Sequence, residues 1–202
     1  MQNLIIIKLG GSVVTDKTKP FYAKERVIRR LGEEIDRARK EYKGNILIGH
    51  GSGSFGHVAA SKHKTHKGLI GKKSLKGLIE TSDAAIGFNR IVISNLIKVG
   101  LPVVSFAPSS FITAKNQRLR SIDIKPITKA LDIGIVPVVF GDVVMDEKQG
   151  FCIFSTEKVL NNLAIGLSKT HRIEIIIHCT DTDGVYDSKG KTIRRKHKPH
   201  FT

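Results

Sequence analysis

Short apolar runs alternate along this chain with longer amphipathic segments. The runs predict strands, and most of them are continuously apolar and rich in isoleucine and valine. This composition is typical of parallel strands that are covered on both faces. The expected strands span residues 4–9, 46–49, 103–106, 135–140 and 173–178.

The segments between these runs have helical spacing. In the first, Val27, Leu31 and Ile35 recur at intervals of four among arginine, glutamate and lysine, which predicts one apolar helix face. The expected helices span residues 22–41, 74–99, 123–132 and 156–169. A further alternating stretch at 143–154 predicts a hairpin, with its turn at Lys148-Gln149-Gly150. Strands that alternate with helices indicate right-handed crossovers and a mostly parallel α/β sheet.

No internal repeat, linker or composition break divides the chain, so we expect a single domain over residues 1–202. Apolar residues make up 40% and charged residues 26%, as in soluble globular proteins. The opening MQNLIIIKLGG is interrupted by Lys8, which favours a buried strand over a signal peptide. Cys152 and Cys179 lack a local metal-binding partner. We therefore expect reduced thiols in a cytoplasmic protein without a membrane span.

The formal net charge of +16 indicates an attraction for anions such as nucleic acid, membrane headgroups or phosphorylated metabolites. One dense basic run, KGKTIRRKHKPH, lies near the end of the chain. No recognised nucleic-acid signature accompanies the basic residues. We expect a small phosphate-bearing ligand rather than a nucleic-acid or membrane partner.

A glycine-rich loop, GHGSGSFGH at residues 49–57, follows the second expected strand. It contains the pattern G-x-G-x-x-G, but a dinucleotide site also needs an acidic residue about 20 positions later. The sequence there, KKSLKGLIE, is basic and helical, and no Walker A lysine follows the glycines. The loop therefore predicts backbone amides that converge on an anion at a helix start, with His57 as a further donor.

Other unusual loops follow the remaining strands. Lys8 and Lys17 flank the pair Gly10-Gly11 after the first strand, where they could neutralise a transferring phosphoryl group. The stretch 179–186, CTDTDGVY, follows the last strand and lacks the spacing of a calcium loop. Gly141-Asp142 forms a fourth turn. Ligands of open parallel sheets lie beyond the carboxyl ends of the strands, where these loops are expected.

Four motifs, in this order and spacing, resemble the amino acid kinase family, and within it the isopentenyl phosphate kinases: KLGGSVVTDK, HGSGSFGH, PVVFGDVV and TDTDGVY. The resemblance extends from residue 4 to about residue 187. It implies a three-layer αβα sandwich with a mainly parallel central sheet. It also implies that ATP phosphates lie over the first glycine loop and the acceptor phosphate over the second, with in-line transfer between them.

Carried over position by position, the resemblance makes Lys8, Lys17 and His57 the catalytic residues. It implies that the nucleotide is bound by Lys8, Gly10, Gly11, Ser12, Gly53, Thr180, Asp181, Asp183 and Gly184. It implies that the acceptor is bound by Ser52, Gly53, Ser54, Gly56 and His57. ATP and Mg²⁺ are the implied cofactors, and no metal-ligating side chain is predicted. A phosphate acceptor already carries an oxyanion nucleophile, so no strong general base is required.

The sequence departs from the family pattern in three places. Ser52 stands where glycine is usual, which requires a negative φ at this position. Ser155-Thr156-Glu157-Lys158 replaces a Ser-Gly-Asp-Asp stretch, and Glu157 is the candidate substitute for its lysine-organising aspartate. The chain ends at Thr202, before the family's Gly-Gly-x-x-x-Lys loop and its final strands and helices. We expect a domain incomplete at its C-terminus, with an exposed apolar edge or face there that could support a homodimer.

The function that this resemblance implies is phosphorylation of isopentenyl phosphate to isopentenyl diphosphate, a step in isoprenoid precursor synthesis. Two alternatives stay open: a kinase for another small phosphate or phosphonate such as fosfomycin, and a catalytically weak protein that binds nucleotide or RNA. Ile86, Phe88 and Ile93 could form the wall of an isoprenoid-tail site or belong to the core.

Overall fold

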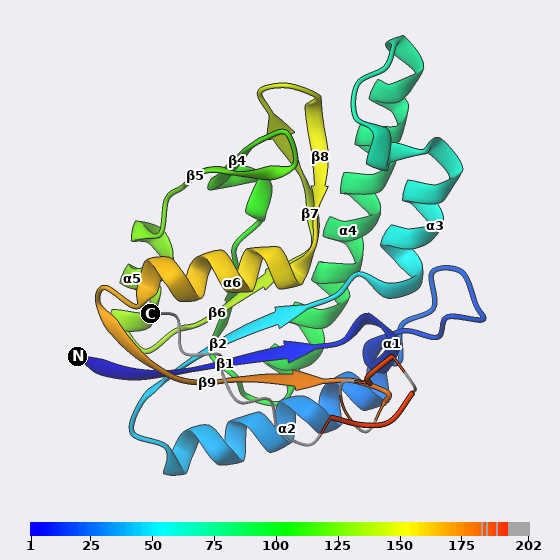
Figure 1. The fold of residues 1–202 in the computed structure, drawn as a ribbon. Coiled ribbons are helices and arrows are strands. Elements are labelled where there is room, and N and C mark those ends of the chain that lie inside the picture. The colour runs from blue at the N-terminus through cyan, green and yellow to red at the C-terminus, as the bar shows by residue number, and fades with distance from the viewer. Residues whose placement is uncertain (183, 185, 189, 194–202) are drawn as a thin grey trace.

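The computed structural model describes residues 1–182, 184, 186–188 and 190–193. A five-stranded sheet lies at the centre of the molecule, with the strand order β3-β6-β2-β1-β9 (Figure 1). Every pair of neighbouring strands in it is parallel. Its strands are β1 (Gln2–Leu9), β2 (Asn45–His50), β3 (Val103–Ser105), β6 (Val136–Phe140) and β9 (His171–Cys179). These are the five strands that the apolar runs predicted.

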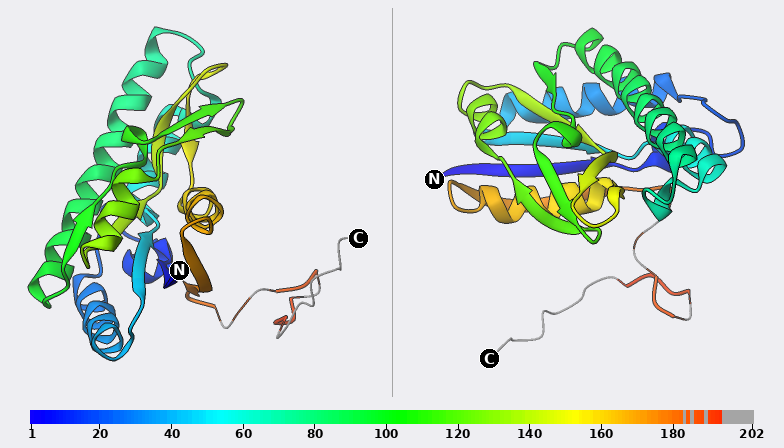
Figure 2. Two further views of the ribbon diagram at one scale, coloured as in Figure 1. Left: turned by 90° about the vertical axis from the view of Figure 1, so that its left-hand side faces the viewer. Right: turned by 90° about the horizontal axis from the view of Figure 1, so that it is seen from above.

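Helices cover both faces of this sheet, which confirms the three-layer arrangement (Figure 2). One face is covered by α2 (Glu25–Glu41) and α4 (Lys72–Lys98), and the other by α5 (Lys125–Asp132) and α6 (Thr156–Leu167). The expected helix starting at residue 22 begins three residues later, and the other predicted ends differ by at most two residues.

The core consists of two apolar clusters, one on each side of the sheet. In β1, Ile7 and Leu9 pack into the cluster with α2 and α4, whereas Leu4 and Ile6 pack into the cluster with α5 and α6. Successive side chains of a strand point to opposite faces. Because both faces are covered, the strand is apolar at nearly every position.

A second, four-stranded sheet has the order β5-β4-β7-β8. It contains the predicted hairpin, β7 (Asp142–Asp146) with β8 (Gly150–Phe154), and a hairpin that the sequence did not predict, β4 (Ile112–Lys115) with β5 (Arg118–Ile122). The short helices α1 (Gly11–Val14), α3 (Gly53–His63), η1 (Thr65–Lys67) and η2 (Pro108–Ser110) complete the described elements.

The buried carboxylate of Asp146 holds the two hairpins together. It accepts backbone N–H bonds from Asn116 at 3.0 Å and Gln117 at 2.7 Å, in the β4–β5 turn, and from Lys148 at 2.8 Å in its own turn. Burial opposes ionisation of Asp146, but these donors outweigh it and lower its pKa to about 2. Asn116 and Gln117 both adopt a positive φ, which this bonding stabilises.

Strand β9 lies at the edge of the main sheet and leaves apolar side chains in solvent. Ile175 is 51% exposed and Ile177 is 39% exposed. This confirms the exposed apolar sheet edge expected near the C-terminus. Within the residues that the structure describes, no helix has the length and apolar character needed to cross a membrane.

Candidate active site

The glycine loops converge because the strands before them end in register. Leu9 of β1 lies opposite His50 of β2 and Cys179 of β9, and His50 lies opposite Phe140 of β6. All four sequence-predicted loops therefore leave the sheet at the same edge. This is the edge where open parallel sheets bind their ligands.

The first two loops touch through their backbones. A Cβ at Gly11 would lie 2.7 Å from the amide nitrogen of Gly53, and one at Gly51 would lie 2.8 Å from the nitrogen of Gly11. The N–H of Gly51 donates to the carbonyl of Leu9 at 3.0 Å. Side chains at these positions would separate the loops, so the glycines allow two strand ends to form one site.

Helix α3 begins in a backbone conformation that favours glycine. Gly53 has a φ of +46°, and a Cβ there would collide with Thr15 Oγ1. Thr15 Oγ1 donates to the Gly11 carbonyl at 2.7 Å and accepts from the Ser54 N–H at 3.1 Å. Ser52, where the resemblance led us to expect glycine, has a φ of −77° and is unstrained. The departure at Ser52 is therefore compatible with the loop.

A cavity of about 360 Å³ lies between these loops, α4 and the β7–β8 sheet. Residues of the two loops form one side of it: Lys8, Gly11, Ser12, Lys17, Gly51, Ser52, Gly53, Gly56 and His57. The remaining lining comes from Ala60, Thr81, Ala85, Gly141, Asp142, Ile153, Ser155, Thr156 and Glu157. The cavity thus combines cations and backbone amides with an apolar part, which suits an anionic group attached to a small apolar one.

Lys8 is held in this cavity by an ion pair. Its ammonium lies 2.5 Å from Glu157 Oε1, and its side chain is 12% exposed. Partial burial of Glu157 is the largest single influence and opposes ionisation. The bond and charge of Lys8, a backbone N–H bond and the Ser155 hydroxyl together outweigh it, so the Glu157 pKa lies below its usual value. Glu157 lies in the first turn of α6, where the helix dipole also favours a negative charge. Glu157 therefore lies where it can orient Lys8, and its role as the substitute for the family's aspartate stays a prediction.

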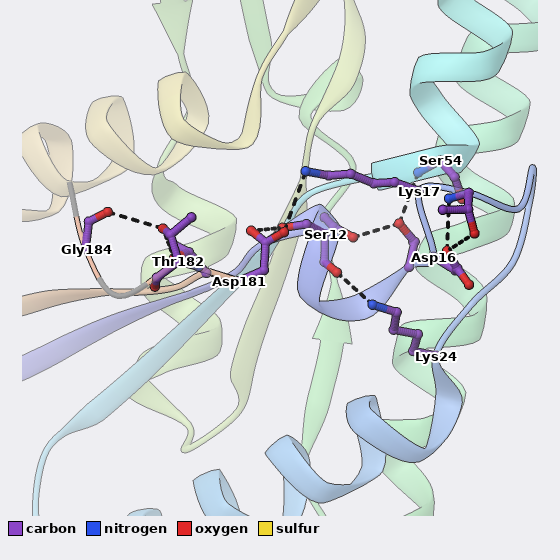
Figure 3. A network of polar contacts seen from close by, with 12 residues as sticks. Ser12, Asp16, Lys17, Lys24, Ser54, Asp181, Thr182 and Gly184 are labelled. Carbon is purple, nitrogen blue, oxygen red and sulfur yellow. Dashed lines mark hydrogen bonds and ion pairs between the residues drawn. The ribbon is translucent and has the colours of Figure 1, made fainter. Parts of the chain in front are cut away.

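Asp181, which follows β9, connects the third loop to the first (Figure 3). It accepts a 2.7 Å bond from the Ser12 hydroxyl, and its carboxylate lies 3.7 Å from the Lys17 ammonium. The Ser12 bond is the main reason why its pKa lies below the usual value. The Ser12 carbonyl in turn accepts from the Lys24 ammonium at 3.0 Å. A carboxylate and two lysines thus surround the first glycine loop.

The comparison with known proteins agrees with this geometry. Residues 3–198 match the amino acid kinase family. This chain belongs to that family. It is 36% identical to the isopentenyl phosphate kinase of Methanocaldococcus jannaschii, over 90% of this chain and 70% of the relative. It is 35% identical to the isopentenyl phosphate kinase of Methanothermobacter thermautotrophicus, over 93% of this chain and 71% of the relative. A crystal structure of an isopentenyl phosphate kinase superimposes with a TM-score of 0.83 at 34% identity, covering 91% of this chain and 74% of that one.

The structure brings most of the residues predicted from the kinase motifs to the cavity. Those that line it are Lys8, Gly11, Ser12, Lys17, Ser52, Gly53, Gly56 and His57. His57 lies at the start of the second turn of α3 and is exposed. Asp181 reaches the site through Ser12 and Lys17, as described above.

The other predicted residues do not line the cavity. Gly10 packs against the Cys179 carbonyl, 2.6 Å from where its Cβ would lie. Ser54 is buried, and its hydroxyl has no hydrogen-bond partner among the described residues. Thr180 donates to the Thr182 carbonyl at 2.8 Å, and Thr182 donates to the Gly184 carbonyl at 3.2 Å. Asp183 lies outside the described residues.

The three apolar residues considered for an isoprenoid tail are not in the cavity lining. Phe88 and Ile93 belong to the core, and Ile86 is 42% exposed. The apolar lining comes instead from Ala60 of α3, Ala85 of α4 and Ile153 of β8. These residues could not be identified from the sequence, because small alanines on a helix carry no chemical signal of their own.

Asp142 also lines the cavity, and the sequence reading noted it only as part of a turn. Its buried carboxylate accepts from the Ser109 hydroxyl at 2.7 Å and from the Val143 N–H at 2.7 Å. Burial is the main influence on its pKa, which lies above the usual value. A Gly-Asp pair directly after a buried strand, at the same edge as two glycine loops, was the signal that could have identified it.

Proposed function

We propose that this protein transfers the γ-phosphoryl group of ATP to isopentenyl phosphate and forms isopentenyl diphosphate. The observation that carries the proposal is the cavity, which two glycine loops, two lysines and His57 line together with apolar residues. The amino acid kinase family provides ATP as the donor. The relatives named isopentenyl phosphate kinase support this acceptor over other small phosphates.

On the donor side, we place the ATP phosphates over Gly10, Gly11 and Ser12. The open backbone of Gly11 faces the cavity, and Lys8 provides a cation held in place by Glu157. Asp181 fixes the Ser12 hydroxyl and lies beside Lys17. Fixed donors and cations stabilise charge on a transferring phosphoryl group without reorganising during the reaction.

On the acceptor side, we place the phosphate of the substrate at the start of α3. The dipole of a helix favours an anion at its N-terminus. In α3 the Ser54 N–H is already bonded to Thr15 Oγ1 and the Phe55 N–H to the Ser52 carbonyl, so the dipole and nearby side chains provide the attraction. His57 follows at the start of the second turn and adds a side-chain donor that lines the cavity. The five-carbon tail would then lie against Ala60, Ala85 and Ile153.

The reaction needs little covalent chemistry from the protein. An oxygen of the acceptor phosphate forms a bond to the γ-phosphorus of ATP, while the bond from that phosphorus to the β–γ bridging oxygen breaks and ADP leaves. The nucleophile is already an oxyanion, so no residue has to remove a proton. We assign Lys17 to the charge that develops on the group in transit.

Mg²⁺ is part of this proposal as a companion of ATP. The described residues contain no group of three histidine, cysteine or acidic side chains that could hold a metal ion. The two carboxylates nearest the lysines, Glu157 and Asp181, face Lys8 and Lys17. Mg²⁺ commonly binds through substrate phosphates and water, with only one or two protein ligands. A site with few carboxylates, such as this one, is therefore compatible with Mg²⁺ bound to the ATP phosphates. When bound, it would neutralise phosphate charge.

We further propose that residues 1–202 act as one amino acid kinase-like domain. The exposed edge strand β9, with Ile175 and Ile177, is the surface through which we expect a homodimer to form. Its test is the oligomeric state of an Ile175→Lys variant compared with the unaltered chain. Loss of a dimer in the variant is expected, and an unchanged monomer in both would contradict this part of the proposal.

The test of the function is ADP release in the presence of ATP, Mg²⁺ and one acceptor at a time. Isopentenyl phosphate is expected to give the highest kcat/KM, well above fosfomycin and carbamate. Methyl phosphate is a matched control, because it keeps the phosphate and lacks the tail. Each buried carbon of the tail contributes about 0.8 kcal/mol, so methyl phosphate, with four carbons fewer, is expected to be roughly two-hundredfold poorer. Higher turnover with fosfomycin or carbamate would contradict the assignment.

A further inference from the structure

The connection between α3 and α4 carries an unusual concentration of positive charge. We call residues 61–76, SKHKTHKGLIGKKSLK, the basic tip. It contains six lysines, and no acidic residue occurs anywhere between His57 and Ile79. Figure 1 shows this connection at the end of α4 that lies away from the five-stranded sheet. Only the basic run near the end of the chain was named from the sequence.

Most of this charge is not neutralised. Lys62 and Lys76 form ion pairs with Glu80, at 2.9 Å and 3.7 Å. The four other lysines of the basic tip are exposed and form no ion pair with any described residue: Lys64, Lys67, Lys72 and Lys73. Glu80 is also bound by His63 at 2.6 Å. One carboxylate therefore serves several cations, and the tip keeps a strong positive field.

Apolar side chains lie in solvent beside these lysines. Ile70 is 71% exposed, Leu69 is 49% exposed and Leu75 is 47% exposed. Together with Gly71 and Lys72 they border a shallow groove of about 440 Å³. Single exposed aliphatic residues are common on protein surfaces, but adjacent ones framed by unpaired cations mark an interaction surface.

The tip is fixed by internal contacts, so these side chains cannot simply fold back into the protein. The Leu69 N–H donates to the Gln149 carbonyl in the β7–β8 turn at 2.8 Å. Thr65 of η1 is joined to Thr81 of α4 by a buried 2.9 Å hydrogen bond between their hydroxyls. A surface that is held in shape loses little conformational entropy when it binds.

We propose that the basic tip docks on the surface of an anionic lipid bilayer. Lysines attract acidic headgroups, and exposed aliphatic side chains enter the boundary between headgroups and acyl chains. A single-stranded nucleic acid fits less well, because the tip has no phenylalanine, tyrosine or tryptophan on which bases could stack. A second copy of the tip would repel the first through their like charges. This peripheral contact differs from the expectation of no membrane partner and does not depend on the proposed function.

Vesicle flotation tests this proposal with the full chain. We expect binding to phosphatidylcholine vesicles that contain phosphatidylserine, little binding to phosphatidylcholine alone, and loss of binding at about 0.5 M salt. Each lysine near an anionic surface contributes about fivefold to binding, so Lys72→Gln with Lys73→Gln should weaken it roughly 30-fold. Ile70→Ser should weaken it about tenfold.

Matched variants on other helices control for general charge and hydrophobicity. Lys125→Gln with Lys129→Gln removes two exposed lysines of α5, and Ile165→Ser removes an isoleucine of α6 that is 69% exposed. These variants should bind vesicles within about twofold of the unaltered chain. All variants should keep the thermal transition and the vesicle-free ATPase or kinase rate of the parent. The proposal fails if anionic vesicles do not bind, if the control variants lose as much affinity, or if single-stranded RNA binds the tip more tightly than the vesicles do.

Discussion

Replacing Gly53 by alanine tests whether the contact between the two glycine loops determines the fold of the site. Gly53 has a φ of +46°, and its added Cβ would collide with Thr15 Oγ1 and lie 2.7 Å from the Gly11 carbonyl oxygen. Thr15 cannot turn away without losing its bonds to Gly11 and to the N–H of Ser54. The methyl group must therefore displace backbone.

The expected cost has two parts. A left-handed conformation costs an alanine about 1–2 kcal/mol relative to glycine. Overpacking against fixed neighbours adds about 1–3 kcal/mol. Gly53→Ala should thus lower the free energy of unfolding by about 2–5 kcal/mol. Such a loss is a large fraction of the stability of a typical domain.

Urea denaturation measures this cost, and two other glycines provide matched controls. Gly100 has a φ of +90° and no atom within 4 Å of its would-be Cβ, so Gly100→Ala should show the conformational cost alone. Gly87 lies within α4, also with open space and without a positive φ, so Gly87→Ala should stabilise the protein by about 0.5–1 kcal/mol. The reasoning is wrong if Gly53→Ala costs no more than Gly100→Ala.

Three further predictions address the lysines and the carboxylates. Glu157→Gln removes the ion pair that holds Lys8, so it should lower kcat about tenfold or more with little change in thermal stability. Steady-state kinetics and a melting curve measure the two effects. An unchanged kcat would contradict the positioning role of Glu157. Lys17→Ala should lower kcat more than it raises the KM of either substrate, because its charge matters most during transfer; the opposite split would exclude it from the transfer step. Asp146→Asn should cost about 2 kcal/mol at pH 7, since the folded pKa of about 2 lies below the ordinary value of 3.8. That stabilisation is present above about pH 4 and is lost as the pH falls through about 2. The urea midpoints of the parent and of Asp146→Asn should therefore converge near pH 2. A difference between the two midpoints that does not change with pH would refute the link to ionisation.

The main sheet could be predicted from the sequence because its signals are local. Each central strand is a continuous apolar run between polar segments, as in 46–49, and each covering helix has an apolar stripe. The β4–β5 hairpin could not be predicted in this way. Its turn at Asn116-Gln117 is stabilised by Asp146, about 30 residues later, and its strands are short and largely polar. Because the residue that stabilises this turn lies far away in the sequence, the hairpin shows no local alternation of apolar and polar residues that would predict it.

The chemically distinctive half of the site could also be predicted. Glycines that let two loops touch, and lysines beside them, stand out in a sequence because few other roles require them. The apolar half could not be identified, since Ala60 and Ala85 become a cavity wall only when α3 and α4 pack beside β8. The candidate tail residues Phe88 and Ile93 were large and on the same helix, yet the helix rotation directs them to the core.

The most direct test of the phosphate site is the affinity of the His57→Ala variant for isopentenyl phosphate, measured by calorimetry. His57 borders the cavity at the start of the second turn of α3. Removing one charge-assisted hydrogen bond costs about 1.5–3 kcal/mol, which corresponds to a roughly 10- to 150-fold weaker Kd. ATP affinity should be unchanged, and His66→Ala, which alters an exposed histidine of the basic tip, should bind isopentenyl phosphate like the parent. An unchanged Kd for isopentenyl phosphate in a folded His57→Ala protein would contradict the account.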